Sequence, residues 1–300
     1  MITNDPSPLA NEPVVEFDTI HTESPNQTAP QQISPWRDVL IAFVVWIGSV
    51  LLLLIVPIVA VLPYLISLVV KGAMLDPVAL GHDKTFLFLS IISVIPAHAL
   101  TLLGIWIVIR RWWKASFWKA LKFSWPPFWA PWQGVTVCFI VAIVLLALGS
   151  LVVKLLGGGK TDLDVLIESS YPTRVATAFL AVATAPLVEE IIYRGMLYPA
   201  IQRLLGMGWS IVVVTIMFAL VHVPQYKNNV GVIVVITILS VVLTMIRAWS
   251  DRLLPSVVIH LIFNGLQSLY LVLEPFIQKA EKVETAPTLI ILYKAIRYLF

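Results

Sequence analysis

The chain has 300 residues, of which 59% are hydrophobic and only 12% are charged. Soluble domains have about 45–50% apolar and about 25% charged residues, so this composition excludes an ordinary soluble protein. The single cysteine, Cys138, excludes a disulfide scaffold and a cysteine-rich zinc site. The net charge of +3 does not point to nucleic acid, because the basic residues stand beside apolar segments. We expect an all-α fold, a polytopic bundle of transmembrane helices.

The first segment, residues 1–36, is an acidic tail. It has five acidic residues and no lysine or arginine, so it carries −5 and leaves +8 on the rest of the chain, given the total of +3. It is rich in Pro, Asn, Gln and Thr and almost free of aromatic residues, so it cannot bury enough surface to fold. No basic start leads into an apolar core, and the tail is therefore not a signal peptide. We expect a disordered extension, and we favour a tether without function over a docking segment.

Apolar segments follow one another along the rest of the chain. About 20 helical residues, at about 1.5 Å each, cross a hydrocarbon core of about 30 Å. The seven spans expected are 39–70, 85–109, 134–156, a segment from 173 into a pair of glutamates, 209–221, 230–246 and 256–273. The last apolar stretch, 289–300, contains Lys294 and Arg297. It predicts either an eighth span or an amphipathic helix at the interface.

A basic, tryptophan-rich loop separates the second and third segments. Its basic and tryptophan residues, with no acidic residue among them, are Arg110, Arg111, Lys114, Lys119, Lys122 and Trp112, Trp113, Trp118, Trp125, Trp129 and Trp132. Tryptophan prefers the headgroup layer and basic residues mark the cytoplasmic side, so we interpret the loop as interfacial and cytoplasmic. This interpretation is favoured over a strip that binds nucleic acid. It also places the N-terminus in the cytoplasm, at the plasma or inner membrane if the host is bacterial.

The expected organisation therefore has three parts. The tail, 1–36, precedes a region of two spans and the basic loop, 37–133, and a helical membrane core, 134–300, follows. The core contains several ionisable residues within apolar segments. Such residues point to function, because each is costly to place in lipid.

The first cluster of polar residues reads Glu189-Glu190-Ile-Ile-Tyr193-Arg194. On a helix, Glu190 and Arg194 are four residues apart, share a face and can form an ion pair. Glu189 lies about 100° round the helix, on the side of Tyr193. We interpret Glu190 and Arg194 as a structural pair. Glu189 is then a desolvated carboxylate beside a like charge, two conditions that suit a general base.

Two further clusters have helical spacing. His222 ends an apolar run, four residues after Phe218, and His260 and Asn264 are four residues apart within the last expected span. Taken alone, the first predicts an interfacial histidine and the second a hydrogen bond between helices. One chain, however, places all three clusters on three separate apolar segments.

Together the clusters resemble the CPBP (CAAX protease and bacteriocin-processing, or Abi) family of intramembrane proteases, which includes the type II CAAX prenyl endopeptidases. The motifs of that family are EExxxR, FxxxH and HxxxN. This sequence has them as Glu189-Glu190…Arg194, Phe218…His222 and His260…Asn264. Tyr193 also fits the EExxYR form frequent in bacterial members. The resemblance covers residues 173–273.

The resemblance implies that the protein hydrolyses a peptide bond of a membrane-associated protein or peptide, within a polar cavity of the bundle. Whether this substrate is prenylated or otherwise lipidated stays open. Glu189 and His222 would hold and deprotonate a water, while His260 and Asn264 would stabilise the oxyanion. Glu190, Arg194 and Tyr193 would support the site. The partners expected for the protein are its membrane-associated substrate and the lipid bilayer. Nucleic acid is not expected as a partner.

A metal-dependent form of this chemistry stays open. Glu189, His222 and His260 are the one carboxylate and two imidazoles that catalytic zinc uses. The cofactor is therefore either none or Zn²⁺. We favour the metal-free form, because Asn264 is a poor zinc ligand and a good donor to an oxyanion.

Other functions fit the sequence less well. A GxS at Gly208-Trp209-Ser210 admits a rhomboid-like serine protease, but a serine at a helix start is more often a cap. A non-catalytic membrane scaffold or bacteriocin-immunity protein would not need intact motifs. A proton-coupled transporter could use the same residues as a relay, although no internal repeat is evident.

The distances along the expected helices present one difficulty. Glu189 and His260 lie near the cytoplasmic ends of their segments, whereas His222 is thirteen residues beyond Trp209. At about 1.5 Å per residue, His222 would lie about 20 Å deep. The three side chains meet only if the fourth segment continues past Arg194, or if the fifth begins lower or tilts.

Overall fold

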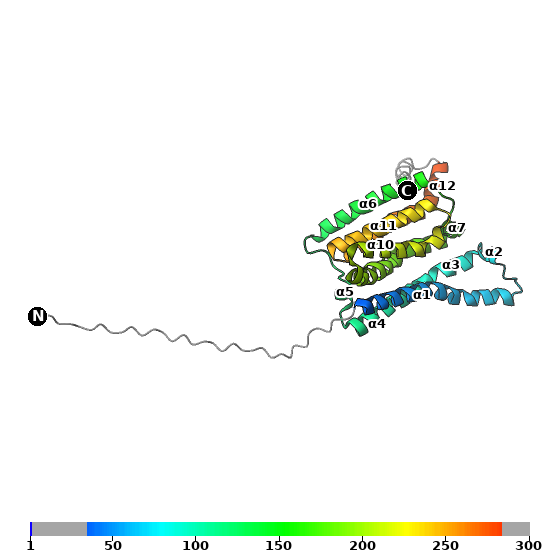
Figure 1. Cartoon of the computed structure of the whole chain (residues 1–300). Coiled ribbons are helices and arrows are strands. Elements are labelled where there is room, and N and C mark those ends of the chain that lie inside the picture. The colour runs from blue at the N-terminus through cyan, green and yellow to red at the C-terminus, as the bar shows by residue number, and fades with distance from the viewer. Residues whose placement is uncertain (2–34, 284–300) are drawn as a thin grey trace. The chain divides into compact units, whose positions relative to one another are not determined.

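The computed structural model of the protein describes residues 35–283 together with Met1, and all regular secondary structure in this part of the chain is helical (Figure 1). The helices, in which η marks a π-helix, are α1 (Pro35–Val70), α2 (Pro77–Leu80), α3 (Lys84–Ile92), α4 (Val94–Val108), η1 (Ile109–Trp113), α5 (Phe117–Ala120), α6 (Pro131–Leu156), α7 (Asp162–Ser169), α8 (Tyr171–Phe179), η2 (Leu180–Thr184), α9 (Ala185–Glu190), η3 (Ile191–Leu197), α10 (Tyr198–Tyr226), α11 (Val230–Ser250) and α12 (Leu254–Val283). The all-α expectation is confirmed for these residues.

Six helical stretches of the described residues are long and apolar enough to cross a membrane. Within their most apolar windows, only 11% to 33% of the residues are buried inside the protein. Most of this apolar surface therefore faces outward, where lipid accepts it and water would not. The protein is an integral, multi-pass membrane protein. The side on which its N-terminus lies stays a prediction.

The fourth and fifth expected spans lie within one helical stretch of 56 residues, Tyr171–Tyr226. Its backbone is non-helical at Gly206, where φ is 75° and ψ is 176°. This left-handed φ suits glycine, which has no Cβ to clash, and it divides α10 into two helical parts. The expected eighth segment, 289–300, and nearly all of the tail lie outside the described residues. The count of seven or eight spans stays a prediction.

Two buried clusters of hydrophobic residues hold the helices together. One joins α1, α4, η3 and α10 and contains Tyr198 and Phe218, which are almost fully buried. The other joins α6, α11 and α12 around Leu243 and Ile259. The segment α9–η3 packs against α12, α1 and α10, so the Glu189-Glu190 motif lies among helices from both ends of the described chain.

The basic loop between η1 and α6 packs partly into the protein. Leu121 is fully buried, and the peptide N–H of Leu253 donates to the carbonyl of Lys122. The aromatic rings of this loop contact one another and α11, as Trp129 and Trp249 do with ring centroids 5.5 Å apart. The loop is thus fixed to the start of α12, close along the chain to the third motif.

Candidate active site

Glu189 lies between two histidines that come from different helices. Its Oε1 is 4.0 Å from Nε2 of His222 on α10, and its Oε2 is 3.8 Å from Nε2 of His260 on α12. The side chains of Glu189 and His222 are 24% and 19% exposed, whereas that of His260 is 3% exposed. The three expected residues therefore converge, and two of them are open to approach from outside the protein.

The reversal at Gly206 explains how the three side chains meet. The fourth segment does continue past Arg194, as far as the bend at Gly206. Glu189 precedes the bend by 17 residues (206 − 189), and His222 follows it by 16 (222 − 206). The two residues are therefore at matching distances along the two arms of one helical hairpin. Glu189 therefore lies at a depth similar to the depth of about 20 Å expected for His222.

The hydrogen bonds of both histidines leave Nε2 directed at Glu189. Nδ1 of His222 is 2.7 Å from the carbonyl oxygen of Phe218, one turn earlier on α10. Nδ1 of His260 is 3.0 Å from Oε1 of Glu190. A carbonyl and a carboxylate oxygen only accept, so each Nδ1 carries the proton. In its neutral form, each ring then presents an unprotonated Nε2 to the carboxylate of Glu189.

Glu190 and Arg194 form a fully buried ion pair, as their spacing indicated. Nη1 of Arg194 donates to Oε1 of Glu190 over 2.8 Å, and both side chains are 0% exposed. The guanidinium also donates to the hydroxyl of Ser240 over 2.8 Å and to the hydroxyl of Thr244 over 3.2 Å, both on α11. These bonds matter because a buried charge is tolerated only when its remaining donors are satisfied. Ser240 and Thr244 were not predicted, although two small polar residues four apart in an apolar segment are the signal for such a role.

Phe218, the aromatic residue of the second motif, lies under the same guanidinium. Cζ of Arg194 is 4.7 Å from the centroid of the Phe218 ring, within the range of a cation–π contact. The ring also contacts the His222 ring, with centroids 4.6 Å apart. Phe218 therefore links the buried arginine of the first motif to the histidine of the second.

Two π-helices, η2 and η3, stand on either side of the six-residue α9 that carries Glu189 and Glu190. A π-helix pairs residues i and i+5 and occurs frequently at functional sites. At α-helical spacing Tyr193 lies on the side of Glu189, and this placement stays a prediction. The Tyr193 hydroxyl accepts a hydrogen bond from Nε1 of Trp46 on α1, over 2.9 Å. That contact between distant segments was not predicted.

Asn264 lies one turn beyond His260 on α12. Its Nδ2 donates to the backbone carbonyl of Ala181 in η2, over 2.9 Å. One of its two N–H groups is thus used within the protein, and the second remains for another acceptor. Its expected role toward an oxyanion stays a prediction.

The residues named for a metal have suitable donor atoms but a wide spacing. Among residues 35–279, no group of three or more His, Cys, Asp or Glu side chains is arranged to hold a metal ion. A tetrahedral zinc with ligands at 2.0–2.1 Å needs donor atoms about 3.4 Å apart. Glu189, His222 and His260 would have to close from 3.8 and 4.0 Å to bind it.

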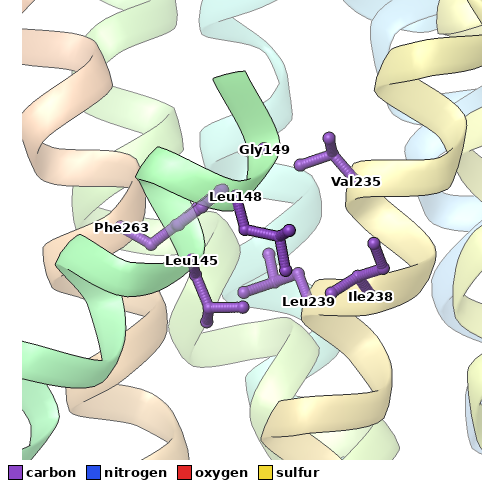
Figure 2. Close-up of a pocket in the computed structure, with 7 residues that line it drawn as sticks. All are labelled: Leu145, Leu148, Gly149, Val235, Ile238, Leu239 and Phe263. Carbon is purple, nitrogen blue, oxygen red and sulfur yellow. The ribbon is translucent and has the colours of Figure 1, made fainter. Parts of the chain in front are cut away.

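A pocket in the described part of the protein is lined by none of these residues (Figure 2). It is an apolar recess between α6, α11 and α12, lined by Leu145, Leu148, Gly149, Val235, Ile238, Leu239 and Phe263. The expected polar cavity around Glu189 therefore stays a prediction.

Two other polar residues have structural roles in the helices. Ser210, of the GxS alternative, is fully buried and donates to the carbonyl of Gly206, beside the bend. Nδ1 of His98 on α4 is 2.8 Å from the hydroxyl of Thr184 in η2, an interhelical hydrogen bond.

The comparison with protein families agrees with the motifs. Residues 171–266 match the model of the family described as type II CAAX prenyl endopeptidase Rce1-like. The resemblance inferred from the three motifs is thus confirmed, over about the same segment. No curated protein and no solved structure matches the chain.

Proposed function

We propose that the protein is an intramembrane endopeptidase that hydrolyses a peptide bond of a membrane-associated protein or peptide. The observation that carries this proposal is the position of the Glu189 carboxylate between Nε2 of His222 and Nε2 of His260. The match to the type II CAAX prenyl endopeptidase model supports the same reaction. It also favours a substrate that is prenylated or otherwise lipidated.

Glu189 and His222 are proposed to hold and deprotonate the attacking water. The 4.0 Å between them exceeds a direct hydrogen bond, so a water beside the pair can bond to both. Both side chains are partly exposed, which lets water and a peptide reach them. The hydroxide formed attacks the scissile carbonyl carbon, and the proton passes to the leaving amine when the C–N bond breaks. General base catalysis of this kind contributes about 10²–10⁴-fold.

His260 and Asn264 are proposed to stabilise the oxyanion. His260 donates through Nε2 when both ring nitrogens carry protons, and Oε1 of Glu190, 3.0 Å from Nδ1, holds the ring in place. Asn264 offers the N–H that Ala181 does not use. Donors fixed in place before the reaction stabilise the developing charge without reorganisation.

Zinc, if bound, would be held by Glu189 and the two Nε2 atoms, and it would supply a water of lowered pKa and a Lewis acid. We favour the metal-free form, because the present spacing suits a bridging water and Asn264 suits an oxyanion. Treatment with 1,10-phenanthroline is expected to leave turnover unchanged. Loss of activity that returns on addition of zinc would reverse this preference.

The test of the function uses purified full-length protein in nanodiscs with a library of quenched peptides, with and without lipid anchors. Glu189→Gln and His222→Ala are expected to lower turnover by about 10²–10⁴-fold. Glu168→Gln is the matched control, because it removes a carboxylate that pairs with Lys160 on the surface, and it should retain wild-type turnover.

Two outcomes would contradict the proposal. Equal turnover in wild type, Glu189→Gln and His222→Ala would exclude these residues from catalysis. No hydrolysis by the wild type would favour the scaffold or immunity function. Proton-coupled uptake by proteoliposomes in the absence of hydrolysis would favour the transporter.

A further inference from the structure

A proline follows each π-helix beside α9, and each proline leaves a backbone carbonyl without its helical donor. In η3, the N–H of Tyr198 donates to the carbonyl of Tyr193. The next donor in this i to i+5 pattern would be residue 199, which is proline and has no N–H. The carbonyl of Arg194 therefore has no backbone partner at either α-helical or π-helical spacing.

The side chain of Arg247 supplies the missing donor. Its Nε donates to the carbonyl oxygen of Arg194 over 3.2 Å, although Arg247, on α11, is 53 residues further along the chain. Arg247 is 4% exposed, so water does not readily take its place. Buried carbonyl groups in proteins are almost always paired, and here a guanidinium replaces a peptide N–H.

The same arrangement occurs in η2. There the N–H of Ala185 donates to the carbonyl of Leu180, and the next residue is Pro186. The carbonyl of Ala181, five residues before that proline, accepts instead from Nδ2 of Asn264 over 2.9 Å. In each of the two π-helices, a proline removes a backbone N–H, and a side chain from another helix donates the hydrogen bond instead. The repetition shows that these side chains complete the helices they contact.

We propose that Arg247 is a positioning residue for the candidate active site. By donating to Arg194 in place of the N–H that Pro199 lacks, it holds η3 in π-helical register. This inference rests on the proposed function, because Arg247 acts through other residues. Arg194 bonds to Glu190 over 2.8 Å, and Glu190 bonds to Nδ1 of His260 over 3.0 Å. A shift of η3 would therefore reach both members of the Glu189-Glu190 motif.

The other end of the Arg247 guanidinium is fixed as well. Its Nη1 donates to Oδ1 of Asp251 over 3.2 Å, and Oδ2 of Asp251 accepts from Lys122 over 2.5 Å. Asp251 has a left-handed φ of 51° at the end of α11. The guanidinium is thus held between the end of its own helix and η3, which limits its freedom and suits a positioning role.

The test compares Arg247→Met and Arg247→Lys with the second-site variant Pro199→Ala, which restores a peptide N–H at residue 199. Arg203→Met is the matched control, because it also removes an arginine paired with an aspartate, Asp38, over 2.8 Å. Two kinds of measurement are made in nanodiscs: the kinetics of a cleaved peptide, as kcat and KM, and amide hydrogen exchange over residues 190–198. The exchange does not depend on activity.

We expect Arg247→Met to lower kcat by about 10- to 100-fold with little change in KM, because a displacement of about 1 Å costs about 100-fold. Exchange over 190–198 should become faster. Arg247→Lys, which keeps a donor, should lose less, and Pro199→Ala should restore kcat and slow exchange in the Arg247→Met background. Arg203→Met should leave both quantities unchanged.

Wild-type kcat and exchange in Arg247→Met would overturn the proposal. So would a double variant, Pro199→Ala with Arg247→Met, that recovers neither quantity. If Arg247→Met alone cannot be purified in folded form, the proposal requires the double variant to fold, and its failure to do so would overturn it. If the wild type hydrolyses no peptide, the proposed function fails, and the exchange rates still decide the role of Arg247.

Discussion

Nδ1 of His260 lies 3.0 Å from Oε1 of Glu190, although 70 residues separate the two along the chain. The same oxygen accepts from Arg194 over 2.8 Å. Glu190 therefore neutralises a buried arginine and also fixes which nitrogen of His260 carries the proton. The two adjacent glutamates have different tasks: Glu190 orients His260, and Glu189 faces the Nε2 that this orientation exposes.

The first prediction concerns the buried pair of Glu190 and Arg194. Arg194→Met should lower the free energy of unfolding by about 3–5 kcal/mol, because it leaves a carboxylate buried without its main partner. The double variant Glu190→Gln with Arg194→Met should lose less free energy of unfolding than the two single variants lose together. Thermal unfolding in detergent measures all three variants, and additive effects would contradict a direct interaction.

A second prediction compares two glycines in spanning helices. A Cβ on Gly134 would lie 2.6 Å from the ring of Trp125, whereas a Cβ on Gly104 would meet nothing within 4 Å. Gly134→Ala should therefore lower the midpoint of thermal unfolding. Gly104→Ala, the control, should leave it unchanged or raise it, because alanine favours a helix by about 1 kcal/mol. Equal midpoints for the two variants would contradict the prediction, because they would mean that Trp125 moves aside at no cost in stability.

The third prediction separates a glutamate-type from a serine-type protease. Ser210→Ala should retain wild-type turnover, because the Ser210 hydroxyl is buried and donates to the carbonyl of Gly206. Removal of a nucleophilic serine lowers kcat by about 10⁶-fold. The peptide assay therefore distinguishes the two, and a loss of that size with the fold retained would support the rhomboid-like mechanism.

A fourth prediction concerns pH and Asp83, which caps α3 outside the spans. The N–H of Phe86 donates to Asp83 over 2.7 Å and lowers the pKa of its carboxyl; partial burial opposes this, and the hydroxyl of Tyr64, at 2.8 Å, adds to the lowering. Because the folded pKa lies below the unfolded value of about 3.9, the ionised group stabilises the protein above that pH. This stability is lost as the pH falls through the folded pKa.

The measurement for Asp83 is the midpoint of thermal unfolding of wild type and Asp83→Asn between pH 7 and pH 3. Asparagine keeps an acceptor for the cap but has no charge. The wild type should be the more stable at pH 7, and the difference should shrink below about pH 4. A difference that does not change with pH would exclude a contribution from ionisation.

Much of the fold was predictable because lipid leaves few choices to an apolar segment. Segments such as 134–156 and 230–246 coincide closely with α6 and α11. The convergence of Glu189, His222 and His260 was also predictable, since polar residues that are costly in lipid must meet one another. These inferences rest on composition and on motifs, so small errors in the assumed helix geometry do not change them.

Other features depended on backbone detail that periodicity does not carry. The bend at Gly206, the two π-helices and the hydrogen bond between Trp46 and Tyr193 were not predicted. Pro186 and Pro199 are the available signals, because a proline just past a functional motif removes a backbone donor. The side chains that donate in place of this missing N–H, Asn264 and Arg247, could not be identified before the helices were placed.

The π-helix η2 places a constraint on chain length. Closing a turn between residues i and i+5 takes one residue more than the α-helical turn. Deletion of a single residue between Leu180 and Thr184 would remove this extra residue and let an α-helix form without interruption, with α9 near its present orientation. Insertion of one more residue would instead rotate α9 by about 100° and turn Glu189 away from both histidines, with no substitution in any motif.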